Sequence, residues 1–473
     1  MEAAKMNSSR SRTFHAAMHP WLAMGHLTPF LHLSNKLAER GHRVSFFSPT
    51  KTISKLESLN LYPHLISFVP LVVPHVDGLP LGAETMSDVP PSMAPILAIA
   101  FHSLQNHVEA LLLDLKPDFV FYDLAGWVPS FTRPLGIKSV YHIIFSAATV
   151  AYFLVPSREI QDDDIKTKMR LMSPPPGFPP SPLNLHLHEL HAISFWARKN
   201  ENTGLSLYDF LSTSMKQCDI ICARTCREIE GPYCDYLESQ YAKPVLLTGP
   251  ALPDQEVIVT HPLEEKWANW LLGFKPGSVL YCAFGSERVL RKDEFQELVQ
   301  GLELTGMPFL VALKPPSGAA TTEEALPEGF EERIRGRGVV HGGWVQQPQI
   351  LAHPSVGCFV SHCGFGSMWE SLMNDCQIVL LPHLEDQCLN SRILTGGLKV
   401  AVEVERREED GWFTRESVCS AVKAVMDEES QIAAELKANH CKLRELLSTD
   451  GLESSYMDNF IKKLQDVMIM SSD

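Results

Sequence analysis

The sequence predicts an α/β protein built from parallel sheets with helices on both faces. Short apolar runs of strand type alternate with helical stretches along most of the chain, and this alternation is typical of parallel sheets. Length agrees, since 473 residues are enough for two domains with sizeable cores. Composition agrees as well, because 45% hydrophobic and 21% charged residues are ordinary values for a globular protein.

Strand and helix patterns divide the chain into two alternating sets. In the first set, strands are predicted at residues 14–18, 43–47, 118–122 and 219–223, with an amphipathic helix over residues 27–40. Residues 174–182 form a proline-rich loop that cannot be a core element. The second set begins at Val279 and runs to about Val425.

The boundary between the two sets is predicted near residue 250, where Gly and Pro residues precede a polar stretch. We therefore expect one domain over residues 1–250 and a second over residues 251–455. A helical stretch at residues 456–470 lies in a C-terminal segment, residues 456–473, that is expected to pack back on the first domain.

Charge and cysteine content limit the kinds of partner and compartment. A formal net charge of −15 argues against nucleic acid or an anionic membrane as a partner. Eleven cysteines without regular spacings favour reduced thiols in the cytoplasm. The apolar residues 140–155 are fewer than the roughly 20 that a membrane span needs, so no span is expected. Residues 1–13 are too polar for a signal peptide.

The segment from Trp344 to Gln387 carries the strongest functional signal. A strand-type run at residues 357–361 leads into a glycine-containing turn, and a helical stretch follows at residues 368–373. Such a turn lets the backbone approach a ligand, and the N–H groups at a helix N-terminus favour an anion. A phosphate group is therefore the expected ligand of this turn.

Side chains around the turn suit a nucleotide sugar. His362 and Ser367 flank it as hydrogen-bond donors, and Glu370 can accept hydrogen bonds from ribose hydroxyls. Trp344 offers a flat face to a base, and the carboxylate of Asp386 beside an amide can hold several sugar hydroxyls. Taken singly, each polar residue also fits an ordinary strand–turn–helix unit. Their combination favours a nucleotide-sugar site.

This segment closely resembles the signature box of plant UDP-dependent glycosyltransferases, which has the same length. The matching positions are Trp344, Gln347, Leu351, His353, Gly357, His362, Cys363, Gly364, Ser367, Glu370, Pro382, Asp386 and Gln387. The resemblance implies a GT-B fold, in which two Rossmann-like domains face each other across a cleft. Weaker similarity extends over nearly the whole chain.

The resemblance also implies roles for individual residues. A tryptophan stacks on uracil, a glutamine and a glutamate hold the ribose, and a histidine and serines contact the phosphates. The positions implied for UDP are Ser286, Trp344, Val345, Gln347, His362, Gly364, Gly366, Ser367 and Glu370, and those for the donor sugar are Phe365, Asp386 and Gln387. Tryptophan is usual in place of Phe365 and asparagine in place of Gly366, which leaves the identity of the donor open.

Catalysis is expected from the first half of the chain. The loop of residues 20–26 follows the first strand, where ligands bind in open α/β sheets. A neutral imidazole at His26 can remove the proton of an attacking hydroxyl near pH 7, and Asp123 can orient that ring. The resemblance implies the same two positions for the catalytic histidine and aspartate.

Other histidines receive weaker assignments. His19, just past the first strand, is expected to be a packed residue, with contact to the acceptor as the alternative. His186, His188, Glu189 and His191 include an HELH sequence. Its spacing is not that of a zinc-binding helix, so no metal site is expected.

The resemblance is closest to the branch that adds a second sugar to flavonoid or anthocyanin glycosides. In its glucose-using relatives a threonine contacts the 6-hydroxyl of the donor sugar. The equivalent position here is Ile144 or Phe145, which suits rhamnose or xylose, whereas a small shift of the alignment brings in Ser146.

The expected activity is an inverting transfer from a UDP-sugar to a hydroxyl of a plant secondary-metabolite glycoside, with His26 as the general base. UDP-sugar is then a co-substrate, the glycoside is the acceptor, and neither a cofactor nor a nucleic-acid partner is expected. The chain is expected to be a monomer. The alternatives are an O-glucosyltransferase acting on a phenolic or terpenoid aglycone, and a catalytically silent nucleotide-sugar binding protein.

Overall fold

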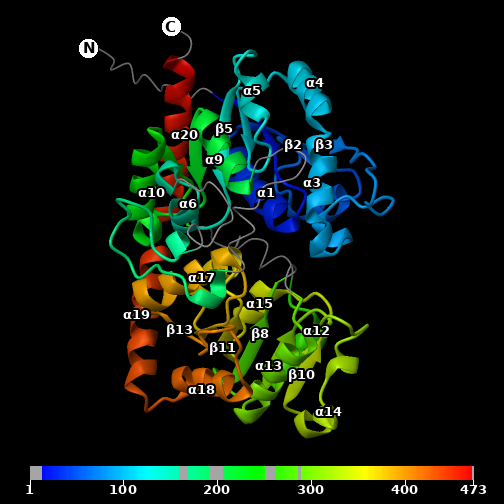
Figure 1. The fold of residues 1–473 in the computed structure, drawn as a ribbon, viewed down its shortest axis with the longest axis vertical. Helices are drawn as coiled ribbons and strands as arrows, with labels where there is room; N and C mark the ends of the chain where they lie inside the picture. The colour runs from blue at the N-terminus through cyan, green and yellow to red at the C-terminus, as the bar shows by residue number, and fades with distance from the viewer. Residues whose placement is uncertain (1–12, 159–168, 191–205, 251–261, 286–288, 471–473) are drawn as a thin grey trace, which may run out of the picture. The chain divides into compact units, whose positions relative to one another are not determined.

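The computed structural model describes residues 13–158, 169–190, 206–250, 262–285 and 289–470. Within these ranges the chain forms two sheets with helices packed on them (Figure 1). All strand pairings recorded for the two sheets are parallel. The predicted α/β class is therefore confirmed.

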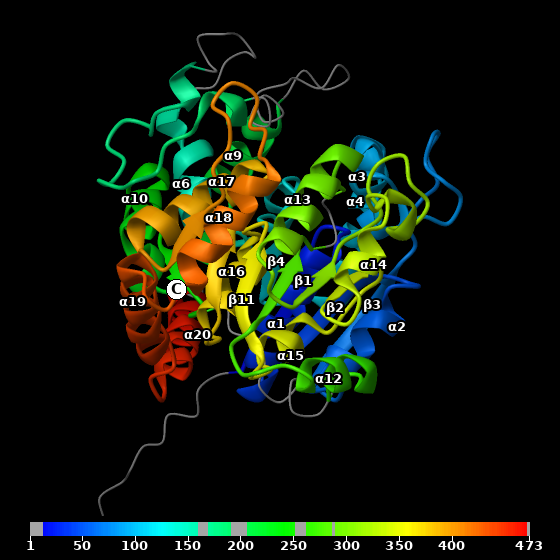
Figure 2. The ribbon, with the colours of Figure 1, turned by 90° about the horizontal axis from the view of Figure 1, so that it is seen from below.

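The first sheet has seven strands in the order β3-β2-β1-β4-β5-β6-β7, and β4, β1, β2 and β3 lie side by side in Figure 2. The strands are β1 (His15–His19), β2 (Arg43–Pro49), β3 (Ile66–Leu71), β4 (Phe119–Tyr122), β5 (Lys138–Ile143), β6 (Ile220–Ala223) and β7 (Val245–Leu247). In the parallel pair of β1 and β4, His19 stands opposite Tyr122. The residues that follow these two strands are therefore neighbours at the carboxyl edge of the sheet.

The second sheet has six strands in the order β10-β9-β8-β11-β12-β13. They are β8 (Val279–Ala283), β9 (Phe309–Ala312), β10 (Gly338–His341), β11 (Val356–Ser361), β12 (Gln377–Leu380) and β13 (Ala401–Glu403). The order reverses direction between β8 and β11, and ligands of open α/β sheets bind at such a switch point.

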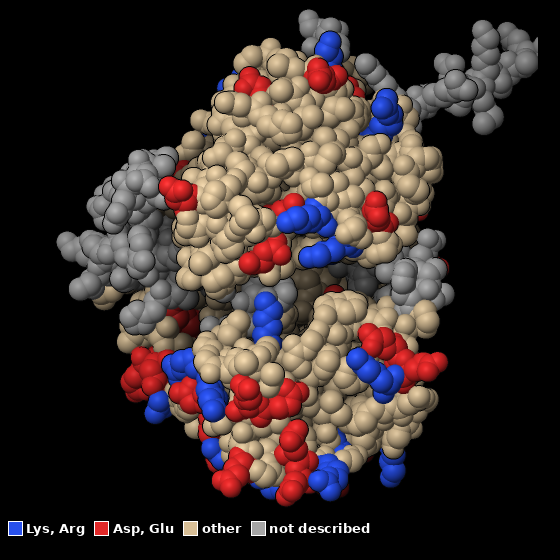
Figure 3. Space-filling model, turned by 90° about the vertical axis from the view of Figure 1, so that its right-hand side faces the viewer, with Lys and Arg blue, Asp and Glu red and all other residues tan. Residues whose placement is uncertain are grey.

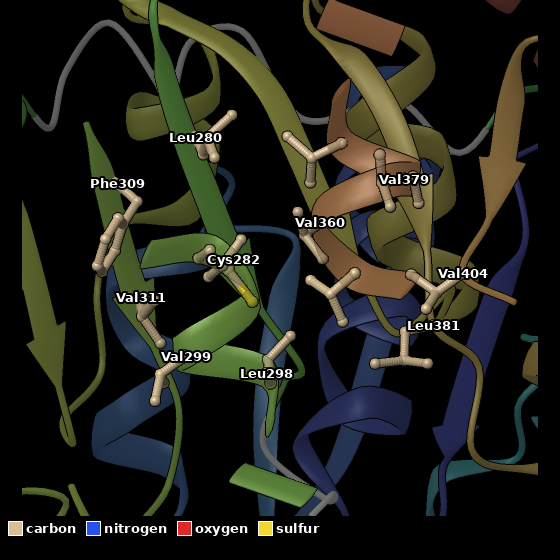
Figure 4. Close-up of a cluster of buried hydrophobic side chains, with 14 of the residues drawn as sticks. Leu280, Cys282, Leu298, Val299, Phe309, Val311, Val360, Val379, Leu381 and Val404 are labelled. Carbon is tan, nitrogen blue, oxygen red and sulfur yellow. The ribbon is translucent and has the colours of Figure 1, made fainter. Parts of the chain in front are cut away.

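Consecutive residues of β8 point to opposite faces of the second sheet. Leu280 and Cys282 belong to a core against which α13 (Lys292–Leu304) and α18 (Arg415–Met426) pack, and Figure 4 shows part of this cluster. Val279 and Tyr281 belong to another core, formed with α12 (Glu265–Leu272) and α15 (Gln347–Leu351). Helices thus cover both faces, which explains why the strands are apolar throughout.

Contacts group the chain into two compact units. One contains Met1–Ile144, Ser214–Cys222 and Ser454–Asp473, and the other contains Phe145–Thr213 and Ala223–Glu453. The predicted division into residues 1–250 and 251–455 stays a prediction. The other α-helices are α1 (Met24–Glu39), α2 (Ile53–Leu56), α3 (Ala94–His102), α4 (Gln105–Leu115), α5 (Val128–Thr132), α6 (Ala147–Phe153), α9 (Leu207–Gln217), α10 (Arg227–Tyr241), α14 (Phe330–Ile334), α16 (Phe365–Leu372), α17 (Glu385–Arg392), α19 (Gln431–Leu447) and α20 (Leu452–Met470).

The last helix, α20, packs on the first sheet within the first unit. The ring of Phe460 lies 6.3 Å from that of Phe121 in β4, measured between centroids. Arg40, at the end of α1, donates to Asp458 over 2.7 Å. A buried aromatic contact and an ion pair therefore hold this helix to β4 and α1.

Two helices begin earlier than predicted. α1 starts at Met24 after the extended residue Ala23, and α16 starts at Phe365 after the extended residue Gly364. Their first turns contain glycine, which costs about 1 kcal/mol in a helix and resembles a loop in sequence. As a result, His26 and Ser367 each lie in the first turn of a helix.

All eleven cysteines of the chain lie in described residues and are free thiols. Ten of them are buried, and Cys441 in α19 is exposed. The predicted reduced state agrees with this arrangement.

Charged side chains are interspersed on the face that Figure 3 shows, where Lys and Arg stand among Asp and Glu. Within the described residues, no single helix has both the length and the apolar composition needed to cross a membrane. The bent pair α3 and α4 reaches these values only when its two helices are taken together.

Candidate functional site

His26 and Asp123 form a hydrogen-bonded pair at the carboxyl edge of the first sheet. The distance from His26 Nδ1 to Asp123 Oδ2 is 2.6 Å, and the two side chains are 20% and 2% exposed. His26 lies in the helix that follows β1, whereas Asp123 directly follows β4. The parallel pairing of these strands brings the two residues together.

Backbone N–H groups fix the Asp123 carboxylate. Its Oδ1 accepts hydrogen bonds from Trp21 N at 2.9 Å and from Leu124 N at 2.5 Å. An ionised carboxylate only accepts, so the proton between the two side chains belongs to His26 Nδ1 and the lone pair lies on Nε2. In this tautomer, Nε2 can take a proton from a substrate hydroxyl, as a general base must.

His19 is completely buried at the end of β1. Its ring stacks on Phe101 with centroids 5.0 Å apart and lies 5.4 Å from Trp127. Burial lowers the pKa of His19 to about 4, although the Asp123 carboxylate acts in the opposite direction. Neither ring nitrogen has a hydrogen-bond partner among the described residues. The structure thus shows a packed, neutral histidine, and the contact with an acceptor stays a prediction.

A buried histidine and a helix N-terminus meet in the turn after β11. Burial lowers the pKa of His362 to about 4, so the imidazole is neutral at physiological pH. Glycines make room for its ring, because a Cβ at Gly364 would lie 2.6 Å from Nε2 and one at Gly285 would lie 3.1 Å from the ring. α16 begins at Phe365, and its first N–H groups have no acceptor within the helix. The turn therefore offers the donors that a diphosphate requires.

Three residues predicted to bind the nucleotide meet in one hydrogen-bonded cluster. Gln347 Nε2 donates to Glu370 Oε2 at 2.6 Å and to Ser367 Oγ at 3.1 Å. Burial raises the pKa of Glu370, while the hydrogen bond from Gln347 and the charge of Arg224 act against this rise. Tyr281 also belongs to the cluster, since its hydroxyl donates to Gln347 Oε1 at 3.2 Å. Its place within an apolar strand concealed this role in the sequence.

Two of the three residues predicted to bind the donor sugar, Asp386 and Gln387, lie in the first turn of α17. Gln387 is 5% exposed, and its Oε1 accepts from two backbone N–H groups at the start of the helix, at 3.0 and 3.1 Å. The oxygen therefore caps α17, which leaves Nε2 for a ligand. Asn390 Nδ2 donates to Cys363 O at 3.1 Å and ties α17 to the turn that carries His362.

The remaining predicted positions differ in exposure. Trp344 is 79% exposed and presents its ring to solvent, whereas Val345 is buried. Phe365 is also buried, and its ring packs edge-on against Trp369. Gly366 is exposed, and a Cβ there would meet no atom within 4 Å. Ser286 lies outside the described residues.

The hydroxyl of Ser146 is engaged within the protein. It donates to Glu230 Oε1 at 2.7 Å and accepts from Thr149 N at 3.3 Å, which caps α6. Burial raises the pKa of Glu230, although its hydrogen bonds act to lower it. Ile144 and Ser146 are buried, while Phe145 is partly exposed. Of the three residues considered for the donor's 6-hydroxyl, Phe145 is therefore the most accessible.

The sequence is similar to those of known plant enzymes. Residues 278–446 match the model of the family described as UDP-glucoronosyl and UDP-glucosyl transferase. The chain is 56% identical to a cyanidin 3-O-galactoside 2″-O-xylosyltransferase of Actinidia chinensis var. chinensis, covering 96% of this chain and 99% of the relative. It is 54% identical to an anthocyanidin 3-O-glucoside 2″-O-glucosyltransferase of Ipomoea nil, covering 97% of this chain and 99% of the relative.

Solved structures share the fold at much lower sequence identity. UGT89C1 of Arabidopsis thaliana, complexed with UDP-L-rhamnose, has a TM-score of 0.74 at 19% identity, covering 96% of this chain and 100% of its own. A UDP-glucose:anthocyanidin 3-O-glucosyltransferase in complex with UDP has a TM-score of 0.75 at 21% identity, covering 97% and 100%. At these identities the likeness concerns the fold alone, and it confirms the predicted GT-B class.

Proposed function

The chain belongs to the family of UDP-dependent glycosyltransferases, and from this premise we propose that it transfers a sugar to the 2″-hydroxyl of an anthocyanidin or flavonol 3-O-glycoside. The family uses a UDP-sugar as its co-substrate. The Actinidia and Ipomoea relatives described above, both more than half identical to this chain, are named for sugar transfer onto an anthocyanin glycoside. The observation that carries the proposed chemistry is the hydrogen bond between His26 and Asp123.

In the proposed reaction, His26 Nε2 takes the proton of the acceptor hydroxyl while that oxygen attacks the anomeric carbon of the donor. The new C–O bond forms as the bond to the diphosphate breaks, so the configuration inverts and UDP leaves with the electron pair. Asp123 stabilises the imidazolium that results. The neutral His362 and the N-terminus of α16 would donate hydrogen bonds to the departing diphosphate.

We further propose UDP-xylose as the donor. The hydroxyl of Ser146 is occupied by Glu230 and α6, and the accessible neighbour, Phe145, has an apolar ring. Such a ring offers no hydrogen bond to a 6-hydroxyl, and xylose lacks that group. The Actinidia relative is named as a xylosyltransferase, which supports the same choice.

The remaining expectations belong to this proposal. The donor would bind to residues 251–455 and the acceptor to residues 1–250. The enzyme would act as a monomer in the cytoplasm, where free thiols remain reduced. Size-exclusion chromatography with light scattering tests the monomer, and a particle of twice the mass of the 52.9 kDa chain would contradict it.

A product assay tests the function. The purified protein would receive cyanidin, cyanidin 3-O-glucoside and cyanidin 3-O-galactoside, each with UDP-xylose, UDP-glucose or UDP-rhamnose, and mass spectrometry would identify the products. We expect a pentose added to a 3-O-glycoside and no product from cyanidin. Conversion of cyanidin would favour the aglycone O-glucosyltransferase. UDP-sugar binding without any transfer would favour the silent binding protein.

A substitution tests the assignment of the base. His26→Ala should lower kcat by about 10²–10⁴-fold and leave the dissociation constant of UDP unchanged, because the ring acts on the acceptor proton. The matched control is His64→Ala, an exposed histidine of the same unit. Near-normal turnover of His26→Ala would rule out this role.

A further inference from the structure

Residues 186–189 have no role in the reaction described so far. In the part of the chain that the structure describes, no group of three His, Cys, Asp or Glu side chains is arranged to hold a metal ion. His191 lies outside that part. Glu189, in the short helix η5 (Leu187–Glu189), is nevertheless only 2% exposed. A carboxylate buried to this extent requires charged or hydrogen-bonding partners.

Glu189 binds two arginines of the same unit. Its Oε1 accepts from Arg392 Nη2 at 2.7 Å and from Arg406 Nη2 at 2.9 Å. Its Oε2 accepts from the backbone N–H of His186 at 2.8 Å. Burial acts to raise the pKa of Glu189, but Arg392, the His186 N–H and Arg406 outweigh burial and hold the pKa below its ordinary value. Glu189 is therefore ionised at neutral pH.

A second carboxylate completes the cluster. Glu403, in β13, lies 2.5 Å from Arg392 Nη1 and 2.9 Å from Arg406 Nη2. The side chains of Arg392 and Arg406 are 9% and 8% exposed, so these two charges and that of Glu189 have little access to water. Glu403 is partly exposed. Two carboxylates balance two guanidinium groups. Removing the charge of Glu189 would leave both cations with one anion in a poorly solvated place.

The cluster fixes the chain on both sides of the first turn of α17. Arg392 is the last residue of that helix. Arg406 Nη1 donates to Pro382 O at 2.9 Å, directly before the loop that leads into the helix. Arg392 and Arg406 thus hold the two ends of the segment that contains Asp386 and Gln387. Both guanidinium groups donate to Glu189, which therefore helps to fix their positions.

Exposed contacts accompany the buried cluster. His186 Nδ1 lies 3.0 Å from Glu408 Oε2, and Leu187 N donates to Glu408 Oε1 at 3.2 Å. Exposed pairs of this kind contribute little to stability. Within the second unit, the position of residues 186–189 therefore depends more on Glu189 than on these exposed contacts.

We propose that Glu189 is a positioning residue that fixes α17, and through it Asp386 and Gln387, for recognition of the donor sugar. This inference rests on the proposed function, in which these two side chains bind the sugar of the UDP-sugar. A helix displaced by about 1 Å would misplace the sugar-binding groups. The residues proposed for uracil and ribose, Trp344 and Gln347, lie outside the clamped segment and would be unaffected.

Binding measurements on Glu189→Gln test the inference, because this substitution keeps the shape of the side chain and removes its charge. Isothermal titration calorimetry would measure the dissociation constants of UDP, UDP-xylose, UDP-glucose and UDP-rhamnose. We expect the constant of the best-bound UDP-sugar to rise about tenfold and that of UDP to stay unchanged. The matched control is Glu297→Gln, which alters an ion pair with Arg415 between α13 and α18 and should change neither constant.

Equal weakening of UDP and UDP-sugar, or no change in either, would overturn the inference. A thermal melt establishes that the variant is folded. Should it be unfolded, the double variant Glu189→Gln/Arg406→Gln keeps the cluster neutral and is expected to show the same selective loss. The ratio of binding constants does not require turnover, so a wild-type protein that transfers no sugar would contradict the proposed function and leave the test of Glu189 intact.

Discussion

At the scale of the residue, the chemistry depends on how Asp123 divides its two oxygens. Oδ1 is held by the backbone of Trp21 and Leu124, and Oδ2 faces His26. These backbone hydrogen bonds fix the carboxylate with Oδ2 toward Nδ1 of His26. Since Oδ2 accepts a hydrogen bond, it favours the tautomer of the imidazole that carries its proton on Nδ1. The reactivity of His26 is therefore determined by a residue that need not touch the substrate.

Asp123→Asn should expose this dependence. The amide oxygen can still accept from the backbone, but the amide nitrogen then faces His26 Nδ1 as a donor and favours the tautomer with its proton on Nε2. We expect kcat to fall by about 10³-fold with the dissociation constant of UDP unchanged. The control is Asp77→Asn, an exposed carboxylate of the same unit. A loss of less than tenfold would mean that the pair does not control the tautomer.

A compact sequence pattern was sufficient to group residues that lie together in the structure, while their roles in binding stay predictions. Gln347, Ser367 and Glu370 were predicted, and the structure joins them in one cluster. The hydrogen bond of Tyr281 to Gln347 and the pairing of Glu189 with two arginines were not predicted, because a tyrosine in an apolar strand and a glutamate beside histidines have commoner explanations. Glu189 and Arg392 are 203 positions apart in the sequence, and no local sequence pattern predicts a contact between residues so widely separated.

At the scale of the element, the second sheet depends on close approach of backbones. The pairing of β11 with β8 shifts register between Val356 and Cys358, and a Cβ at the intervening Gly357 would lie 2.0 Å from the carbonyl oxygen of Gly277. A side chain at this position would force the backbone of one strand to shift. In α16, by contrast, a Cβ at Gly366 would meet nothing within 4 Å.

Replacing each of the two glycines by alanine should change the free energy of unfolding in opposite directions. Gly357→Ala should lower the free energy of unfolding by about 1–3 kcal/mol, since the backbone must shift. Gly366→Ala should raise it by about 0.5–1 kcal/mol, since alanine is the better helix former. Urea denaturation at pH 7.5 measures both, and changes of the same sign would contradict the comparison.

Element types were more predictable than element boundaries. The strand at residues 43–47 and the helix at residues 27–40 follow from apolar periodicity, and the structure contains both as β2 and α1. Periodicity could not show that α1 and α16 begin earlier, because each first turn contains a glycine and resembles a loop in sequence. The local backbone geometry after Ala23 and Gly364 decides those starts.

At the scale of the whole molecule, alternating strands and helices predicted two parallel sheets, which the structure contains. The assignment of Phe145–Thr213 to the second unit could not be predicted in this way. Contacts such as the ion pair between Glu189 and Arg392 contribute to it, and such pairs leave no periodic trace in the sequence.

Buried histidines should make the stability of the molecule depend on pH. Burial lowers the pKa values of His19 and His362 to about 4. Between about pH 6.5 and pH 4 the unfolded chain therefore binds protons that the folded chain does not, so stability is lost as the pH falls. Each histidine contributes about 3 kcal/mol over the full window.

Urea denaturation between pH 7 and pH 4.5 measures this loss. The variant His19→Phe removes one of the histidines with a lowered pKa and keeps a ring against Phe101. Its free energy of unfolding should therefore fall less steeply with acidification than that of the wild type. Equal slopes in the two proteins would show that His19 does not titrate on unfolding.

One of the eleven cysteines is accessible to a thiol reagent in the native protein. Ten cysteines are buried and Cys441, on α19, is exposed. A colorimetric thiol reagent should therefore consume one equivalent rapidly from the native protein and eleven after denaturation. A maleimide dye would therefore label α19 of the unmodified protein at Cys441. The slower reaction of the buried cysteines would measure the rate at which the hydrophobic cores open.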